Sequence, residues 1–247
     1  MRGRFSLSSI AWLVLLAITT AVPVAPAQGG PDVFVTPIPN APFSGVIQVE
    51  RSFVQRDGSV VNRKTIRDIG RDGQGRIFNQ YRMLLPDSSS ETPQVLSILV
   101  YDPQTRASTT LFPQQRTFRT GTANRPPETM PPNFLDASST GSGRPQNQFT
   151  KQEDLGIHEI AGLPAHGLRE TQTIPAESNN TGRDIVVTDE CWYSEDLRIN
   201  LVVKHSDPRK GAVTMTVNQV TRTEPDPALF RIPDGYTPAG AAQETKQ

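Results

Sequence analysis

Hydrophobic and polar side chains alternate along much of this chain. Ile47, Val49 and Phe53 are separated by polar residues, and Val213 and Met215 alternate with threonines nearer the other end. Alternation with a period of two is the pattern of a β-strand with one buried face. Turn signals such as Asp-Gly separate the alternating stretches, so the sequence predicts strands joined by hairpins.

The expected strands follow one another without a long helical pattern between them. Short hairpin links join only antiparallel neighbours, and the alternation leaves one face of the sheet buried and the other in solvent. Because helical segments are scarce, we expect the sheet to curl and so cover its own apolar face. The predicted fold is mainly β: a single curved antiparallel sheet (a half-barrel or meander) with few short helices and a long Pro-rich loop. Its expected strands cover 44–53, 60–69, 76–85, 94–101, 107–112, 155–160, 165–174, 184–193, 198–205 and 213–218.

The alternation fails over 119–150. Four prolines fall within 126–132, and a Ser/Thr/Gly tract follows at 138–143. Proline lacks the donor that a central strand needs, so this segment is expected to be a long loop, either disordered or functional. It could also divide two domains. Neither half has a clear core of its own, so we expect one β-rich domain over 43–237 and a flexible tail over 238–247.

The N-terminus has the pattern of a removable export signal. Arg2 and Arg4 precede an uncharged apolar stretch over 7–22, and an Ala-Pro-Ala motif ends at Ala27. We therefore predict a signal peptide over 1–27 with cleavage after Ala27. The alternative is a transmembrane anchor, but polar residues interrupt the stretch and no positively charged stop-transfer cluster follows. The mature protein is expected to be periplasmic or extracellular with no integral membrane span, beginning with an extended lead-in over 28–42.

Charge and cysteine content narrow the choice of partners. Loss of residues 1–27 removes two of the 25 basic residues and none of the 25 acidic ones, which leaves a net charge of about −2. Nucleic acid or an anionic membrane would call for clustered basic charge, so neither is an expected partner. The single Cys191 excludes an internal disulfide. We expect a small buried hydrophobe there; the alternative is a reactive or intermolecular thiol, whose pKa the neighbouring Asp189 and Glu190 would raise.

Catalytic motifs are missing from the sequence. It has no Gly-x-Ser-x-Gly nucleophile elbow, no glycine-rich phosphate loop and no His-Glu-x-x-His zinc helix. Of the three histidines, His158 and His166 could face each other across one hairpin with Glu159 close by, which makes a metal site conceivable; the third is His205. Strand histidines are more often polar surface residues, and no paired ligand spacing supports zinc. We therefore expect no catalytic residue, no metal and no cofactor.

The aromatic pair Trp192-Tyr193 is the most informative local feature. Consecutive strand residues point to opposite faces, so we expect one core anchor and one surface aromatic. The alternative is an aromatic lining for an apolar ligand. On this alternative, the aromatic pair and apolar side chains of the neighbouring expected strands would line the ligand site. The candidate ligand-binding residues are therefore Trp192, Tyr193, Leu201, Val203 and Met215.

Several short motifs follow one scheme of strands and turns. They occur at 43–47 (Phe-Ser-Gly-Val-Ile), 159–167, 191–197 (Cys-Trp-Tyr-Ser-Glu-Asp-Leu), 202–204, 207–211 (Asp-Pro-Arg-Lys-Gly) and 225–236. Together they resemble the lipoprotein-carrier (LolA-like) superfamily of secreted bacterial proteins. The resemblance implies an unclosed, strongly curved antiparallel sheet with a concave apolar face. In the carriers that face holds lipoprotein acyl chains, and related domains act as envelope stress sensors.

Three functions remain open on the sequence alone. The first is an exported periplasmic, non-enzymatic binding protein that carries or senses a lipid-like or apolar ligand on the concave face. The second is an envelope structural or protein-interaction module with a protein partner and no small ligand. The third is an enzyme with a His/acid site. An apolar cavity would favour the first, a fully packed face the second, and a histidine meeting an acid in a cleft the third.

Overall fold

The computed structural model describes residues 32–123 and 149–240, which belong to the unit Pro31–Gln247. Strands dominate this part of the chain, and its helical residues form two short 3-10 turns, η2 (Ala176–Ser178) and η3 (Pro227–Phe230). The strands are β1 (Phe43–Val54), β2 (Val60–Arg71), β3 (Ile77–Arg82), β4 (Leu85–Pro86), β5 (Val95–Asp102), β6 (Ala107–Phe112), β7 (Thr117–Thr122), β8 (Thr150–Ile160), β9 (Leu163–Ile174), β10 (Ile185–Ser194), β11 (Ile199–Asp207), β12 (Gly211–Thr221) and β13 (Thr237–Pro238).

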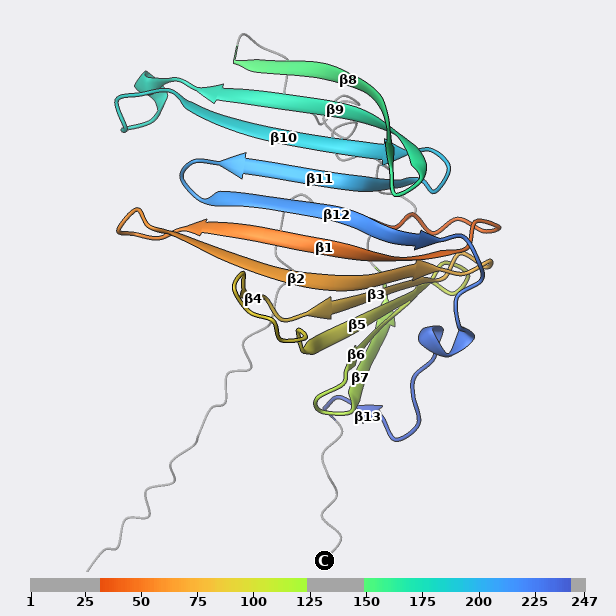
Figure 1. Cartoon of the computed structure of the whole chain (residues 1–247). Helices are drawn as coiled ribbons and strands as arrows, with labels where there is room; N and C mark the ends of the chain where they lie inside the picture. Colours follow the sequence, from red (N-terminus) through yellow and green to blue (C-terminus); the bar gives the residue numbers. More distant parts are fainter. Residues whose placement is uncertain (1–31, 124–148, 241–247) are drawn as a thin grey trace, which may run out of the picture. The chain divides into compact units, whose positions relative to one another are not determined.

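All of these strands belong to one open, curved sheet (Figure 1). Its order is β13-β7-β6-β5-β3-β2-β1-β12-β11-β10-β9-β8, and β4 pairs with β2 off this path. Pairing is antiparallel except between β13 and β7, which run parallel. The predicted fold class is confirmed. The sheet is not one continuous meander, however: β1 pairs with β12, so two meanders distant in sequence join side by side.

The segment expected to be a loop over 119–150 is shorter at both ends. β7 covers Thr117–Thr122 and β8 begins at Thr150, five residues before the strand that we expected. Both strands are largely exposed, and a strand without a buried face shows no alternation of apolar and polar residues. Residues 124–148 lie outside the described residues. So do the predicted signal peptide with its cleavage position and the end of the predicted C-terminal tail.

One face of the sheet carries most of the buried apolar side chains. In the strand register Cys191 lies opposite Val203, Val203 opposite Met215, and Met215 opposite Val49. These four residues therefore form a row across β10, β11, β12 and β1. We call this side the apolar face, and its buried residues on these strands are Ile47, Val49, Cys191, Leu201, Val203, Met215 and Val217.

The segment that precedes β1 is more than an extended lead-in. Val33 and Val35 are buried in the same core cluster as the apolar face, and Val35 forms an isolated antiparallel bridge with Ile199 of β11. Arg67 of β2 forms an ion pair with Asp32 in this segment. We call residues 32–42 the strap, because side chains of the sheet hold its backbone and its ends.

The opposite face has a smaller core of its own. Phe78 and Val100 pack there with Phe230 of η3, and the Phe78 and Phe230 rings meet edge to face with centroids 6.4 Å apart. The C-terminal segment thus covers the outside of β3 and β5. Within 32–123 and 149–240, no helix is long and apolar enough to cross a membrane.

Candidate functional site

Three of the five candidate binding residues lie together on the apolar face. Leu201 and Val203 are 0% exposed and Met215 is 1% exposed. The buried cluster that contains them draws side chains from eight neighbouring strands of the sheet: β5, β3, β2, β1, β12, β11, β10 and β9. Its described members from outside the strands are few: Val33 and Val35 of the strap, Leu197 of the β10–β11 turn and, partly buried, Ala123 after β7.

Trp192 lies on the other face of β10. Its register partners are Val202 and Gly167, one position along from Cys191 and its partner Val203. The indole ring covers Gly167, where an added Cβ would lie 2.6 Å from a ring carbon. Trp192 nevertheless belongs to the same buried cluster as Leu201, Val203 and Met215.

The expectation of one core and one surface aromatic was wrong. Trp192 is only 9% exposed and Tyr193 only 7% exposed. The His158 ring stacks on the indole with centroids 4.8 Å apart, and the indole N–H donates to Glu190 Oε1 at 2.8 Å. Trp192 is therefore held between Gly167, an imidazole and a carboxylate, and takes a structural role on this face.

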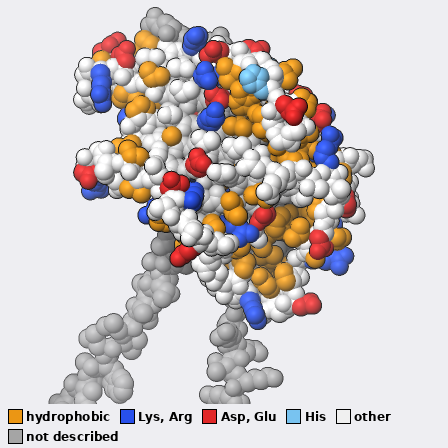
Figure 2. Space-filling view, viewed as in Figure 1, with side chains coloured by type: hydrophobic (Ala, Val, Ile, Leu, Met, Phe, Trp, Pro, Cys, Tyr) orange, Lys and Arg blue, Asp and Glu red, His pale blue; other side chains and the backbone are white. Residues whose placement is uncertain are grey.

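Charged side chains form a row of alternating sign beside Trp192. Glu153, Arg169, Glu190 and Lys204 are successive cross-strand partners on β8, β9, β10 and β11. Arg169 Nη2 lies 2.8 Å from Glu190 Oε2, and Lys204 Nζ lies 2.9 Å from Glu190 Oε1. Opposite charges on directly paired strand positions stabilise the pairing. Figure 2 shows acidic and basic side chains interspersed in the same way over one face of the molecule.

Glu190 is the central residue of this row and its side chain is 7% exposed. Burial opposes ionisation and is the largest single influence on its pKa. Hydrogen bonds from Lys204, Trp192 and Arg169 outweigh that burial and lower the pKa from 4.5 to about 2. The carboxylate is therefore ionised at every physiological pH, which does not suit a proton-transfer role near neutrality.

The lowered pKa of Glu190 predicts a loss of stability in acid. Because the pKa is lower in the folded protein, the contribution is complete above about pH 4.5 and is lost as the pH falls towards 2. We expect urea unfolding to show a free-energy loss on the order of 2 kcal/mol across this window, allowing for the solvent-exposed cations. Glu190→Gln should remove this part of the pH dependence, whereas Glu195→Gln, in an exposed turn, should retain it. Parallel pH profiles for wild type and Glu190→Gln would contradict the assignment.

The histidines do not form the metal site that was conceivable from the sequence. His158 is paired with Ala165 and His166 with Ile157, so their side chains point to opposite faces of the hairpin. His166 Nε2 lies 2.8 Å from Asp154 Oδ1, but both side chains are exposed rather than placed in a cleft. Among the described residues no group of three His, Cys, Asp or Glu side chains could hold a metal ion.

His205 meets an acid as well. Its Nδ1 lies 2.6 Å from Asp189 Oδ1, and the two residues are direct cross-strand partners. Asp189 thus has a histidine partner, while Glu190 has both an arginine and a lysine. Cys191, which follows these two carboxylates in β10, is buried as expected of a small hydrophobe.

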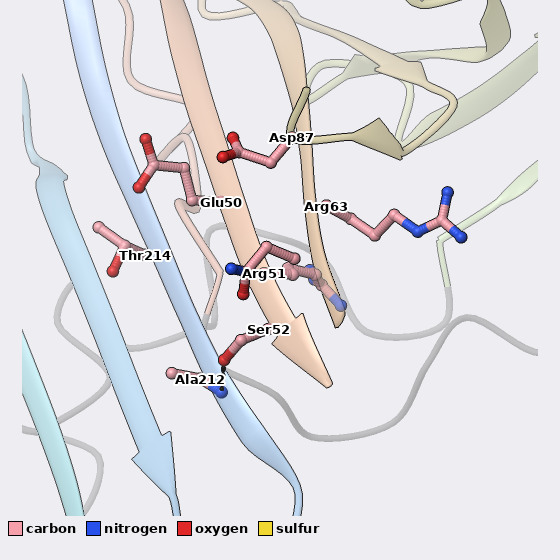
Figure 3. A pocket seen from close by; sticks show the side chains of 8 residues that line it. Glu50, Arg51, Ser52, Arg63, Asp87, Ala212 and Thr214 are labelled. Atoms are coloured by element: carbon pink, nitrogen blue, oxygen red, sulfur yellow. Dashed lines mark hydrogen bonds between the residues drawn. The ribbon is translucent and has the colours of Figure 1, made fainter. Parts of the chain in front are cut away.

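The hollows found among the described residues are open and lined by both polar and apolar side chains. One of about 350 Å³ is lined by Glu50, Arg51, Ser52, Asp87 and neighbouring side chains (Figure 3). In the close-up Glu50 and Thr214 project from adjacent strands, and the Ala212 N–H donates to Ser52 Oγ at 2.8 Å. A second hollow of about 430 Å³ lies on the face that also carries Phe78. Neither is lined by the candidate binding residues.

Comparisons with known proteins give matches of fold only. No family model matches the sequence, and no curated protein matches it. The chain is similar to the MucA/MucB complex of Pseudomonas aeruginosa (14% identity, TM-score 0.38), over 77% of this chain and 55% of that one. It is similar to a LolA superfamily protein of Nitrosomonas europaea (9% identity, TM-score 0.31, 78% and 91% covered) and to LprF of Mycobacterium bovis (14%, 0.30, 76% and 90%).

The chain spans little more than half the length of the MucB-type chain that it matches. At TM-scores of 0.38 and below, no residue of this chain can be matched to a functional residue of these proteins. The functional argument therefore rests on the geometry of this chain: an open, curved antiparallel sheet with one buried apolar face.

Proposed function

We propose that this chain is an exported, non-enzymatic binding protein of the cell envelope that holds a lipid-like ligand against the apolar face of its sheet. One observation carries the proposal: the apolar face is broad and the described segments that cover it are few. Strands β1, β10, β11 and β12 supply the buried side chains of the apolar face, whereas Val33, Val35, Leu197 and Ala123 are the described members of the buried cluster from outside the strands. Apolar area of this extent is what an acyl chain requires for stable binding.

Binding requires a local opening, because Leu201 and Val203 are fully buried in the present state. We place this opening at the strap, whose Val33 and Val35 lie in the same buried cluster. Its Val35 is joined to β11 through one isolated bridge with Ile199 rather than through a ladder of strand hydrogen bonds. Segments held by few backbone pairs open at a small free-energy cost. An acyl chain would then replace Val33 and Val35 against the sheet.

A protein-interaction module is the second candidate, and one observation favours it. The apolar face is already packed, and neither hollow found on the described surface is lined by its side chains Leu201, Val203 and Met215. Partner contacts would then fall on β8, which lies at one end of the sheet and is largely exposed along its length. An exposed edge strand can accept a partner strand through its backbone groups.

The two candidates are separated by a pair of neighbouring substitutions on β11. Val203→Thr places a hydroxyl on the apolar face, and Val202→Thr makes the same change on the opposite face beside Trp192. A buried hydroxyl without a partner costs about 1–3 kcal/mol. In a titration with a fluorescent fatty acid we expect Val203→Thr to bind about tenfold more weakly than wild type, and Val202→Thr to bind within about twofold of it.

Absence of fatty-acid binding by the wild-type protein would reject the lipid-binding proposal and leave the interaction module. Equal weakening by Val203→Thr and Val202→Thr would also reject the apolar face as the site, because the effect would then follow stability rather than contact. Thermal unfolding of both variants supplies that comparison directly.

A further inference from the structure

Arg71 is a fully buried cation at the end of β2. It is 0% exposed and is among the largest completely buried side chains of the described chain. Its three hydrogen bonds all go to backbone carbonyls: Nε donates to Ala41 O at 2.8 Å, and Nη1 donates to Thr36 O at 2.7 Å and to Leu197 O at 3.0 Å. Arg71 thereby joins the strap, β2 and the β10–β11 turn.

The second terminal nitrogen of Arg71 is buried and has no hydrogen-bond partner among the described residues. A guanidinium carries five N–H donors and no acceptor, so both N–H groups of Nη2 are unused. A buried donor without a partner costs about 1–3 kcal/mol, and more when it is charged. Such a group in a native protein calls for an explanation, and a missing anionic partner is one.

Arg71 also keeps its charge in this buried place. Burial, the largest influence, lowers its pKa to about 10; Tyr193 raises it and Arg198 lowers it, and the guanidinium stays protonated at neutral pH. No carboxylate forms an ion pair with it among the described residues. Arg67, four residues earlier on the same face of β2, is the contrast: it forms an ion pair with Asp32 and donates to Asn79 Oδ1.

The surroundings of Arg71 connect it with the apolar face. Its guanidinium lies 5.1 Å from the centre of the Phe43 ring. Phe43, Leu197 and Val35 belong to the same buried cluster as Leu201 and Val203. A positive charge with two unused donors therefore lies at the margin of a continuous apolar surface. This is the arrangement that an amphiphile with an anionic head group would match.

We propose that Arg71 is the head-group site of the ligand: the carboxylate of a fatty acid or the phosphate of a phospholipid accepts hydrogen bonds from Arg71 Nη2 while the acyl chain lies on the apolar face. This inference rests on the proposed function, because it specifies the ligand of the same face. Carboxylate and phosphate both offer two oxygens that the planar guanidinium of arginine can bind as a bidentate pair.

The test compares ligands of equal chain length and different head groups. Dodecanoate, dodecyl phosphate and dodecan-1-ol are titrated into the wild-type protein by calorimetry at neutral pH. Hydrogen bonds to charged groups contribute about 1.5–3 kcal/mol. We therefore expect at least one of the two anions to bind about 10- to 100-fold more tightly than the alcohol. The tighter of the two anions identifies a carboxylate or a phosphate as the source.

Two variants test whether Arg71 causes the preference for anions over the alcohol. Arg71→Met removes the cation with little loss of volume and should reduce the preference for anions to within about twofold. Arg67→Met, which removes a cation that already has its own carboxylate, should retain the preference. If Arg71→Met does not fold, equal affinity of the wild-type protein for the alcohol and both anions still overturns the assignment, and Arg67→Met still tests the other buried cation as the source of an anion preference.

Each outcome has one meaning. Equal affinity for the alcohol and both anions would overturn the head-group assignment and leave lipid binding by the apolar face intact. An anion preference retained in folded Arg71→Met would overturn it as well. Absence of binding by all three amphiphiles would overturn the proposed function and the head-group site together.

Discussion

Replacement of Gly211 by alanine is expected to destabilise the protein by more than about 3 kcal/mol. Gly211 has φ 112°, a conformation that L-residues rarely adopt, and an added Cβ would lie 2.0 Å from Ser52 O and 2.7 Å from Ser52 C. Both are backbone atoms, so no side chain can move aside. Gly211 also pairs with Phe53 across the junction of β1 and β12. The substitution therefore acts where the two meanders are joined.

Gly58→Ala is the matched control for Gly211→Ala. Gly58 has φ 83°, and an added Cβ would meet no atom within 4 Å. Gly58→Ala therefore costs only the free energy of placing alanine in this unusual backbone conformation, about 1 kcal/mol. Urea unfolding of both variants measures the difference. Similar losses for the two would show that the close approach of β1 and β12 at Gly211 is not as described.

Gly167→Ala is expected to cost about 2 kcal/mol and to displace the Trp192 ring. An added Cβ would lie 2.6–2.7 Å from three ring carbons, and the ring cannot retreat easily because His158 stacks on it and Glu190 accepts its N–H. The only other tryptophan is Trp12, within the predicted signal peptide. Fluorescence of the processed protein therefore reports on Trp192 alone, and we expect a red-shifted emission.

Gly45→Ala provides the comparison on β1. An added Cβ there would meet Val217 Cγ1 at 3.4 Å, an ordinary contact, and no positive φ is involved. We expect a change within about 0.5 kcal/mol and an unchanged emission maximum. An unchanged spectrum for Gly167→Ala would mean that the ring does not cover Gly167 in solution.

The pattern of apolar and polar residues was sufficient for the strands that have one buried face. The alternation around Ile47, Val49 and Met215 predicted β1 and β12, and the alternation around Leu201 and Val203 predicted β11. The pattern failed for β7 and for the first half of β8, where no face is buried and solvent imposes no period on the side chains. Strand propensity alone is too weak to reveal such segments.

Long-range pairing was the second part that local reasoning could not supply. The β1–β12 junction joins positions such as Val49 and Met215, which no hairpin connects. The row of Glu153, Arg169, Glu190 and Lys204 becomes visible only once the strand register is known, because the four charges are distant in sequence. Arg71 gave no signal in the sequence, since its partners are backbone carbonyls, which every residue possesses.

The assignment of Trp192 shows the same limit from another side. The sequence predicted that the side chains of the consecutive residues Trp192 and Tyr193 point to opposite faces of the strand. It did not predict which of the two faces each side chain takes. Gly167 supplies the missing reason, because the absence of a Cβ there makes room for the indole on the face away from Val203. A glycine opposite a tryptophan can be found from the sequence once the hairpin partners are aligned.

The central claim is that the apolar face holds a lipid-like ligand, and native mass spectrometry tests it most directly. The full chain is expressed with its own N-terminal segment, purified from the periplasm without detergent, and weighed before and after extraction with organic solvent. We predict an additional mass that extraction removes and that is identified as an anionic lipid or fatty acid. A ligand-free mass, with no uptake of added fatty acid, would contradict the claim and leave the protein-interaction module as the function to test.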